Sequence, residues 1–147
     1  MNLVQLEAER FAVFAVCDQN WGCPVLACLD AAEGQYPAAY QDMRTILFEE
    51  VPRNGVPTRP RKWIKRLKDP FLEFKSKEPP RVIALRVIFF QKMENTAIIC
   101  TNAFLKNGKA PDWLSEAQQR LAEYDACSWD EIEIRYLIRP EKPWRIH

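Results

Sequence analysis

The chain has 147 residues, of which 48% are hydrophobic and 28% are charged, so its composition predicts one globular domain and excludes a mostly disordered protein. The formal net charge of +1 points by itself to no class of partner. No apolar run approaches the roughly 18 residues that span a bilayer, and residues 1–10 lack the features of a secretory signal, so we expect a cytoplasmic protein with no membrane partner.

The first third of the chain predicts one strand and two helices. Residues 10–16 read RFAVFAV, which is rich in aromatic and β-branched side chains and is typical of a strand. Residues 24–33 begin with a proline and precede a glycine, which favours a short helix, although the apolar run 25–27 also fits a strand. Apolar residues recur at helical spacing over 37–50, which predicts a second helix there.

The rest of the chain predicts several strands and one further helix. Three strand candidates follow a turn-rich connector in quick succession: Phe71–Lys75, Val82–Phe90 and Ala97–Phe104. The short links between them favour an antiparallel meander. Residues 112–124 repeat apolar side chains at helical spacing and predict an amphipathic helix that packs on the sheet. Residues 131–136 alternate charged and apolar side chains, which predicts an added strand at a sheet edge.

The charge is distributed unevenly along the chain. Residues 53–109 carry fourteen basic and four acidic side chains, a net charge of +10, whereas both flanking segments are acidic. The densest cluster of these cations, at 53–68, is expected of a protein that binds a phosphate backbone, and the alternatives are a solvated loop or a patch that docks an acidic protein. Trp63 lies inside the densest part and either stacks on a base or anchors the segment to the core. That densest part, 53–68, holds seven cations and no carboxylate: Arg53, Arg59, Arg61, Lys62, Lys65, Arg66 and Lys68.

Arg86 is a lone cation in an otherwise apolar strand candidate. Alternation places it on one face of that strand with Ala84, Ile88 and Phe90. An unpaired buried charge is costly, so two alternatives stay open for this side chain. Arg86 either meets a carboxylate in a structural salt bridge or opens onto a polar groove where an anionic ligand pairs with it.

The side chains available for catalysis are mainly lysines and arginines. The only histidine is His147, which disfavours a hydrolytic triad, and the carboxylates of the basic segment lack the spacing of a metal cage. The five cysteines lack the spacing of a zinc site or a disulfide framework, so we interpret them as small buried hydrophobes in a reduced compartment. We therefore expect no metal and no cofactor. Metal-free cleavage of RNA fits these residues, because the 2′-hydroxyl is a built-in nucleophile and cationic side chains stabilise the charge on the phosphate.

The order of motifs along the chain resembles a known family. The segments GCPVLACLDAAEGQYP, KRLKDPFLEFKS, RVIALRVIFF and ICTNAFLKNGKAP follow one another, and their most specific pieces are EFK at 73–75, RVIFF at 86–90 and FLKNGKAP at 104–111. Over roughly residues 10–125 the chain resembles the RelE/HigB-like toxins of bacterial type II toxin–antitoxin systems, within the RelE/ParE superfamily and particularly its phage-derived branch.

This resemblance implies a fold, an activity and partners. The fold would be α+β and RelE-like, with N-terminal helices packed on a curved antiparallel sheet, a further C-terminal helix and a strand-like tail. Residues 1–125 would form the toxin domain and residues 126–147 an extension packed on it. Relatives of this kind are mRNA interferases, that is, endoribonucleases that cleave mRNA, commonly on the translating ribosome. A cognate antitoxin, often with a helix-turn-helix domain, neutralises them.

Carried over residue by residue, the resemblance implies three catalytic side chains. Arg86 would clamp the scissile phosphate, Lys75 would act in proton transfer, and Lys106 would lie near the leaving oxygen. Seven further cations would hold the RNA backbone or ribosomal RNA: Lys62, Lys65, Arg66, Lys68, Lys77, Arg81 and Lys109.

Two other functions stay open beside the cleavage of mRNA. Relatives on the same fold inhibit a protein target such as gyrase, because a fold does not determine a function. Many relatives also carry a histidine where this chain has Thr101-Asn102, which suggests a phage-derived module that binds RNA or protein without catalysis. For an RNA-cleaving toxin, the sequence predicts that Arg86→Ala relieves growth arrest without unfolding the protein.

Overall fold

The computed structural model describes residues 1–76, 84–106 and 109–139. Nothing in the described ranges forms a helix both long enough and apolar enough to cross a membrane. In chain order the elements are β1 (Asn2–Ala8), β2 (Ala12–Cys17), α1 (Pro24–Gln35), α2 (Pro37–Thr45), the π-helical turn η1 (Ile46–Glu50), α3 (Val51–Asn54), β3 (Ile64–Arg66), β4 (Leu72–Lys75), β5 (Ala84–Lys92), β6 (Ala97–Lys106), α4 (Leu114–Asp125), α5 (Trp129–Glu131), the π-helical turn η2 (Ile132–Tyr136) and β7 (Leu137–Ile138).

The fold is α+β and is built around one mixed sheet. Its seven strands, counted over the described residues, lie in the order β3-β4-β5-β6-β2-β1-β7. Strands β3 to β6 form an antiparallel meander, so the meander predicted from the short links is confirmed. The prediction of a wholly antiparallel sheet is wrong, because β2 pairs in parallel with β6 and β1 pairs in parallel with β7. Short links constrain only strands that are neighbours in the chain, whereas helices and the first three strands of the meander separate β2 from β6.

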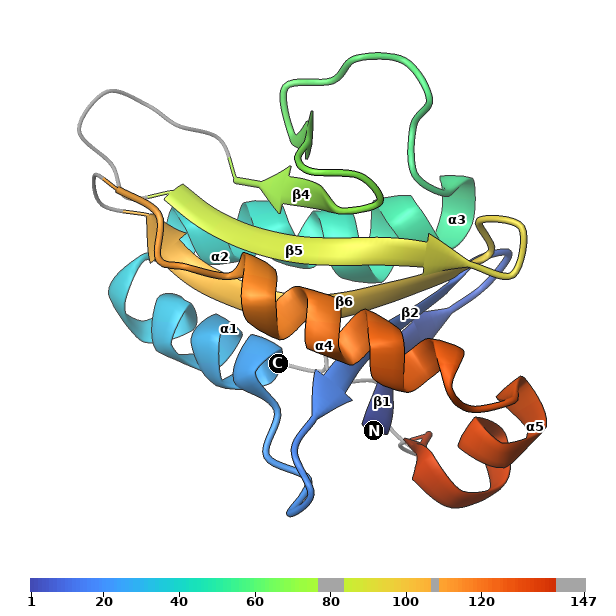
Figure 1. The fold of residues 1–147 in the computed structure, drawn as a ribbon. Coiled ribbons are helices and arrows are strands. Elements are labelled where there is room, and N and C mark those ends of the chain that lie inside the picture. The colour runs from blue at the N-terminus through green and yellow to red at the C-terminus, as the bar shows by residue number, and fades with distance from the viewer. Residues whose placement is uncertain (77–83, 107–108, 140–147) are drawn as a thin grey trace.

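The N-terminal helices pack on one face of the sheet (Figure 1). The helices predicted for 24–33 and 37–50 are confirmed as α1 and as α2 with η1, and the strand alternative at 25–27 is wrong. Both α1 and α2 begin with a proline, whose fixed φ suits the first helical position. The predicted strand at 10–16 is confirmed as β2, whereas β1 before it was not expected from the sequence.

The C-terminal helix α4 packs on the opposite face of the sheet (Figure 1). The helix predicted for 112–124 is therefore confirmed. The strand predicted for 131–136 is wrong, because these residues are helical in α5 and η2. Ser128 starts this turn by accepting a hydrogen bond from the Glu131 N–H at 3.2 Å, and Ile132 packs into the core. A strand does lie at this edge, but it is the two-residue β7 that follows.

Alternation along β5 divides its side chains between the two faces. Leu85, Val87 and Phe89 pack under the N-terminal helices, whereas Ile88 and Phe90 pack under α4. This is the division that the sequence predicts for the described part of the strand. Arg86 therefore lies on the face of the sheet that α4 covers.

Candidate functional site

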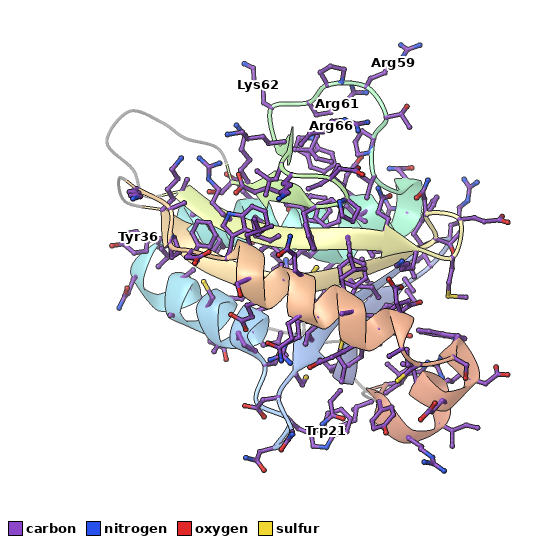
Figure 2. The ribbon with its side chains drawn as sticks, in the orientation of Figure 1. Trp21, Tyr36, Arg59, Arg61, Lys62 and Arg66 are labelled. Carbon is purple, nitrogen blue, oxygen red and sulfur yellow. The ribbon has the colours of Figure 1, made fainter. Side chains whose placement is uncertain are left out.

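The segment 53–68, which holds seven cations and no carboxylate in the sequence, is here called the basic connector. Its seven lysines and arginines are all exposed. Arg53 lies 3.9 Å from Glu9, and in the part of the chain that the structure describes the other six form no ion pair with a carboxylate. Figure 2 shows Arg59, Arg61, Lys62 and Arg66 along the loop that projects from the sheet. Six of the seven cations therefore form a positive surface that no carboxylate within the described ranges neutralises.

Three contacts fix the two ends of the basic connector to the fold. At the start, the Phe11 N–H donates to the Pro52 carbonyl at 3.0 Å. Gly55 has a φ of +77°, and a Cβ built on it would lie 2.7 Å from the Phe11 ring, so this position requires glycine. At the far end, the Trp63 ring packs 6.0 Å from the Phe74 ring. Trp63 is thus an anchor to the core, which is one of the two alternatives that the sequence left open.

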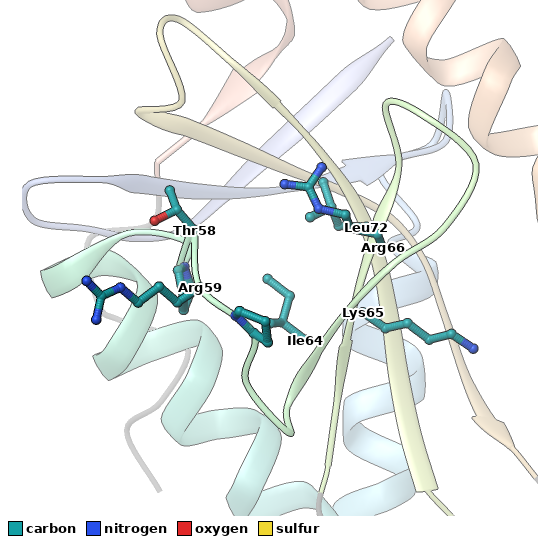
Figure 3. A pocket seen from close by; sticks show the side chains of 8 residues that line it. Thr58, Arg59, Ile64, Lys65, Arg66 and Leu72 are labelled. Atoms are coloured by element: carbon teal, nitrogen blue, oxygen red, sulfur yellow. The ribbon is translucent and has the colours of Figure 1, made fainter.

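A groove is formed by the basic connector itself, which includes β3, together with Leu72 of β4. It encloses about 180 Å³. Figure 3 shows Ile64 between Arg59 and Lys65, with Arg66 beside Leu72. Eight residues line it: Pro57, Thr58, Arg59, Pro60, Ile64, Lys65, Arg66 and Leu72. The groove thus combines an apolar lining with cationic side chains, which suits a ligand that carries both flat rings and phosphates.

The three side chains predicted to be catalytic share one face of the sheet. Lys75 pairs across β4 and β5 with Arg86, and Lys106 pairs across β5 and β6 with Ala84. Opposed residues of antiparallel strands project to the same side, and Ala84 projects to the same side as Arg86. Lys75 and Lys106 are both half-buried. The fold therefore brings these three positions together at one end of the strands.

Arg86 forms a buried ion pair. Its Nη1 lies 2.6 Å from Glu73 Oε1, and the two side chains are only 6% and 7% exposed. The structure therefore has the salt bridge, which is the first of the two alternatives that the sequence left open. A direct clamp on a phosphate needs a guanidinium that solvent can reach, and Arg86 offers almost no surface for that contact.

The other predicted contacts to RNA fall in three places. Lys62, Lys65, Arg66 and Lys68 lie in the basic connector, and Lys109 is exposed between β6 and α4. Lys77 and Arg81 lie outside the described residues. Arg59 lines the groove, but the resemblance gives this residue no role. The density of cations around Arg59 in the sequence was the signal that could have identified it.

No group of three or more histidine, cysteine or carboxylate side chains able to hold a metal ion occurs in residues 1–76, 84–106 and 109–139. Comparisons with known proteins add no relative: no family model matches the chain, and neither a curated protein nor a solved structure matches it. The functional argument consequently depends on the geometry and charge of the residues themselves.

Proposed function

We propose that this protein binds RNA through its basic connector and acts on mRNA as the toxin component of a type II toxin–antitoxin system. The observation that carries the proposal is the exposed run of seven cations without a carboxylate, folded around a groove. Cations that neutralise phosphates release condensed counterions, so a surface of this kind favours a nucleic acid. RNA suits the groove because single-stranded RNA offers unstacked bases, for which Ile64 and Leu72 provide an apolar surface.

Cleavage of the bound RNA is the activity we propose for this toxin. It is favoured by one specific observation, the alignment of Lys75, Arg86 and Lys106 on one face of the sheet. Lys75 and Lys106 are half-buried and retain surface for contact with a phosphate or a leaving oxygen. Arg86 is a positioning residue in this proposal, since its ion pair with Glu73 holds β5 against β4 beside Lys75. The chemistry is that of a metal-free endoribonuclease, with the 2′-hydroxyl as nucleophile.

The partners follow from the same proposal. A ribosome presents both mRNA and ribosomal RNA to the basic connector, and a cognate antitoxin would neutralise the toxin. Inhibition of a protein target such as gyrase, and binding without catalysis, are the alternatives that the experiments below separate from cleavage.

Binding is tested by the salt dependence of affinity for a single-stranded RNA oligonucleotide, measured by fluorescence anisotropy. For single strands the slope of log K against log[salt] is about −0.7 per neutralised phosphate, so Lys65→Gln/Arg66→Gln should weaken binding and flatten the slope by about 1.4. The matched control is Arg10→Gln/Arg135→Gln, which removes two exposed cations outside the basic connector and should leave the slope unchanged. Equal losses in both variants would contradict a specific role for the basic connector.

Cleavage is tested in a translating extract by mapping new 5′ ends of mRNA. Wild-type protein should generate new ends, and Lys75→Gln, with its fold checked by circular dichroism, should generate far fewer. Intact transcripts with the wild-type protein, together with RNA binding, would support a non-catalytic binder. Intact transcripts with DNA damage would support a gyrase-type target.

A further inference from the structure

Alternation along β3 separates two neighbouring cations of the basic connector. Arg66 lies opposite Leu72 in the ladder between β3 and β4, whereas Lys65 lies opposite Glu73. Leu72 packs against the core under the N-terminal helices, so Arg66 belongs to that face of the sheet. Leu67, two residues after Lys65, packs against the core under α4. Lys65, although it also borders the groove, therefore projects toward the α4 face, and Figure 3 shows its side chain extending away from that of Arg66.

Lys65 and Lys75 are close neighbours on the α4 face. Both flank Glu73, because Lys65 pairs with it across the two strands and Lys75 follows it by two residues in β4. Diagonal neighbours of this kind in an antiparallel ladder are roughly 7–8 Å apart, which long side chains can span. The ammonium groups of the two lysines can therefore reach one shared ligand.

The charges of these two lysines are not neutralised by the carboxylate between them. Glu73 is only 7% exposed, and its Oε1 lies 2.6 Å from Arg86 Nη1, so Arg86 compensates its charge. Within the described ranges neither Lys65 nor Lys75 forms an ion pair with a carboxylate. Lys65 is exposed and Lys75 is half-buried, so both keep surface for a ligand. Two like charges this close repel each other, and an anion bound between them relieves the repulsion.

The position of β3 connects this pair of lysines to the groove. β3 is three residues long and lies at one edge of the sheet that the described strands form. Ile64 and Arg66, which line the groove, are the immediate neighbours of Lys65 in the chain, at a rise of about 3.3 Å per residue. A strand of RNA can therefore pass from the groove to Lys65 around the edge of β3, without crossing the sheet.

We propose that Lys65 and Lys75 together bind one phosphate of the RNA on the α4 face, while the groove on the other face of β3 holds an adjacent nucleotide. The proposal rests on the function proposed above and adds the path by which one RNA strand connects the basic connector to the lysines predicted to be catalytic. A phosphate suits the pair because its oxygens accept charge-assisted hydrogen bonds from two ammonium groups at once.

RNA fits this path better than an acidic protein does. A nucleic acid strand carries an anion at every residue, which matches cations that follow one another around the edge of β3, and its bases match the apolar lining of the groove. A segment of an acidic protein offers carboxylates without the flat rings. An acidic protein is therefore the competing partner in the test.

The test is a double-mutant cycle on affinity for a single-stranded 2′-O-methyl RNA, which lacks the nucleophile for cleavage, measured by fluorescence anisotropy. Lys65→Gln and Lys75→Gln should each weaken binding. Because the two lysines share one phosphate, the loss in the double variant should differ from the product of the two separate losses by more than about twofold. The matched cycle combines Arg66→Gln with Lys75→Gln. Arg66 neighbours Lys65 but projects from the other face, so here the losses should multiply to within about twofold.

Two further variants guard the result against changes in the fold. Lys65→Arg keeps the cation and should retain the coupling to Lys75, and Lys75→Met replaces Lys75→Gln if circular dichroism shows that the latter is unfolded. Losses that multiply to within twofold for Lys65 and Lys75, or equal coupling in both cycles, would overturn the shared phosphate while leaving RNA binding in place. Failure of the wild-type protein to bind single-stranded RNA would overturn the proposed function and this path with it. Tighter binding of poly-glutamate than of RNA at the same salt concentration would assign the pair to an acidic protein and also overturn the proposal.

Discussion

At the scale of single residues, the sheet accommodates Arg86 because its counter-charge comes from the neighbouring strand. Glu73 lies on β4, diagonal to Arg86, and both side chains are almost fully withdrawn from solvent. Two buried charges stabilise a fold only as a pair, since either one alone keeps the penalty for leaving water. The sequence identified Arg86 as exceptional but could not choose its partner, because strand register decides which carboxylate it meets.

This pairing predicts that Arg86→Ala destabilises the protein by about 3–5 kcal/mol, because Glu73 would stay buried without a counter-charge. Urea denaturation followed by circular dichroism measures the change. The expectation from sequence alone, that this variant stays folded, is thereby replaced. The double variant Glu73→Leu/Arg86→Met should recover much of the loss, since it removes both charges. If Arg86→Ala proves as stable as wild type, the ion pair contributes little to the fold.

The thiolate of Cys23 predicts a pH dependence. Alkylation requires the thiolate, so the rate rises with pH through the pKa. The pKa of Cys23 lies below its ordinary value because the neighbouring Cys17 thiol and the Leu26 and Val25 N–H groups favour the thiolate, although burial opposes this shift. The acidic groups around it are Asp18, Cys17 and Cys100, and the charge on Asp18 acts in the opposite direction.

Iodoacetamide labelling across a pH series measures this dependence. Cys23 in the folded protein should reach half its maximal rate at a lower pH than it does in the urea-unfolded chain. Cys28, whose pKa burial raises, should shift toward higher pH on folding. Identical profiles for Cys23 in the folded and unfolded proteins would contradict a lowered pKa of Cys23 in the folded protein.

At the scale of elements, local sequence patterns predict a helix or strand correctly where one pattern dominates and wrongly where two patterns compete. The helix-starting prolines and the apolar spacing of 24–50 agree, and the helices form there. Residues 131–136 alternate like a strand, yet Ser128 and Glu131 have the spacing of a helix N-terminal capping box, and the helical turn forms. Burial of Ile132 favours the turn, with Ile134 left 81% exposed. Local alternation alone could not reveal which of these two patterns prevails.

Two glycines predict opposite effects of the same substitution. Gly55→Ala should destabilise the protein by about 1–3 kcal/mol, because its backbone conformation is one that only glycine adopts readily and the added methyl would contact the Phe11 ring. Gly34→Ala is the matched control, since Gly34 lies in α1 with open space around it, and it should stabilise the protein by about 0.5–1 kcal/mol. Thermal unfolding of both variants measures the difference, and equal effects would contradict a strained Gly55.

At the scale of the whole molecule, the sequence was sufficient for the α+β class, for the meander and for most helices, but not for the order of strands. That order depends on β2 pairing with β6, a contact between Ala12 and Ala97 for which no local pattern exists. The candidate functional site is likewise only partly predictable from the sequence. The run of cations predicts the basic connector, whereas the groove depends on β3 folding back onto β4.

The sheet order predicts where the backbone is most protected. Amides of the central strands β5, β6 and β2, which have strands on both sides, should exchange hydrogen with solvent slowest. Amides of β3 and β7, which are three and two residues long at the two edges, should exchange fastest among the strands. Hydrogen–deuterium exchange with mass spectrometry measures both groups. Fast exchange in β6 would contradict this sheet order.

The parallel contact between β2 and β6 also determines when this protein can assemble during its own synthesis. The N-terminal hairpin leaves the ribosome early, but β6, the strand that covers its open edge, follows only after the basic connector and the strands β4 and β5 have been translated. Until then the nascent chain exposes an unpaired β2 edge and a stretch of positive charge beside ribosomal RNA. Contacts so distant in sequence also slow folding. Because of this strand order, the sheet can be completed only after most of the chain has been synthesised.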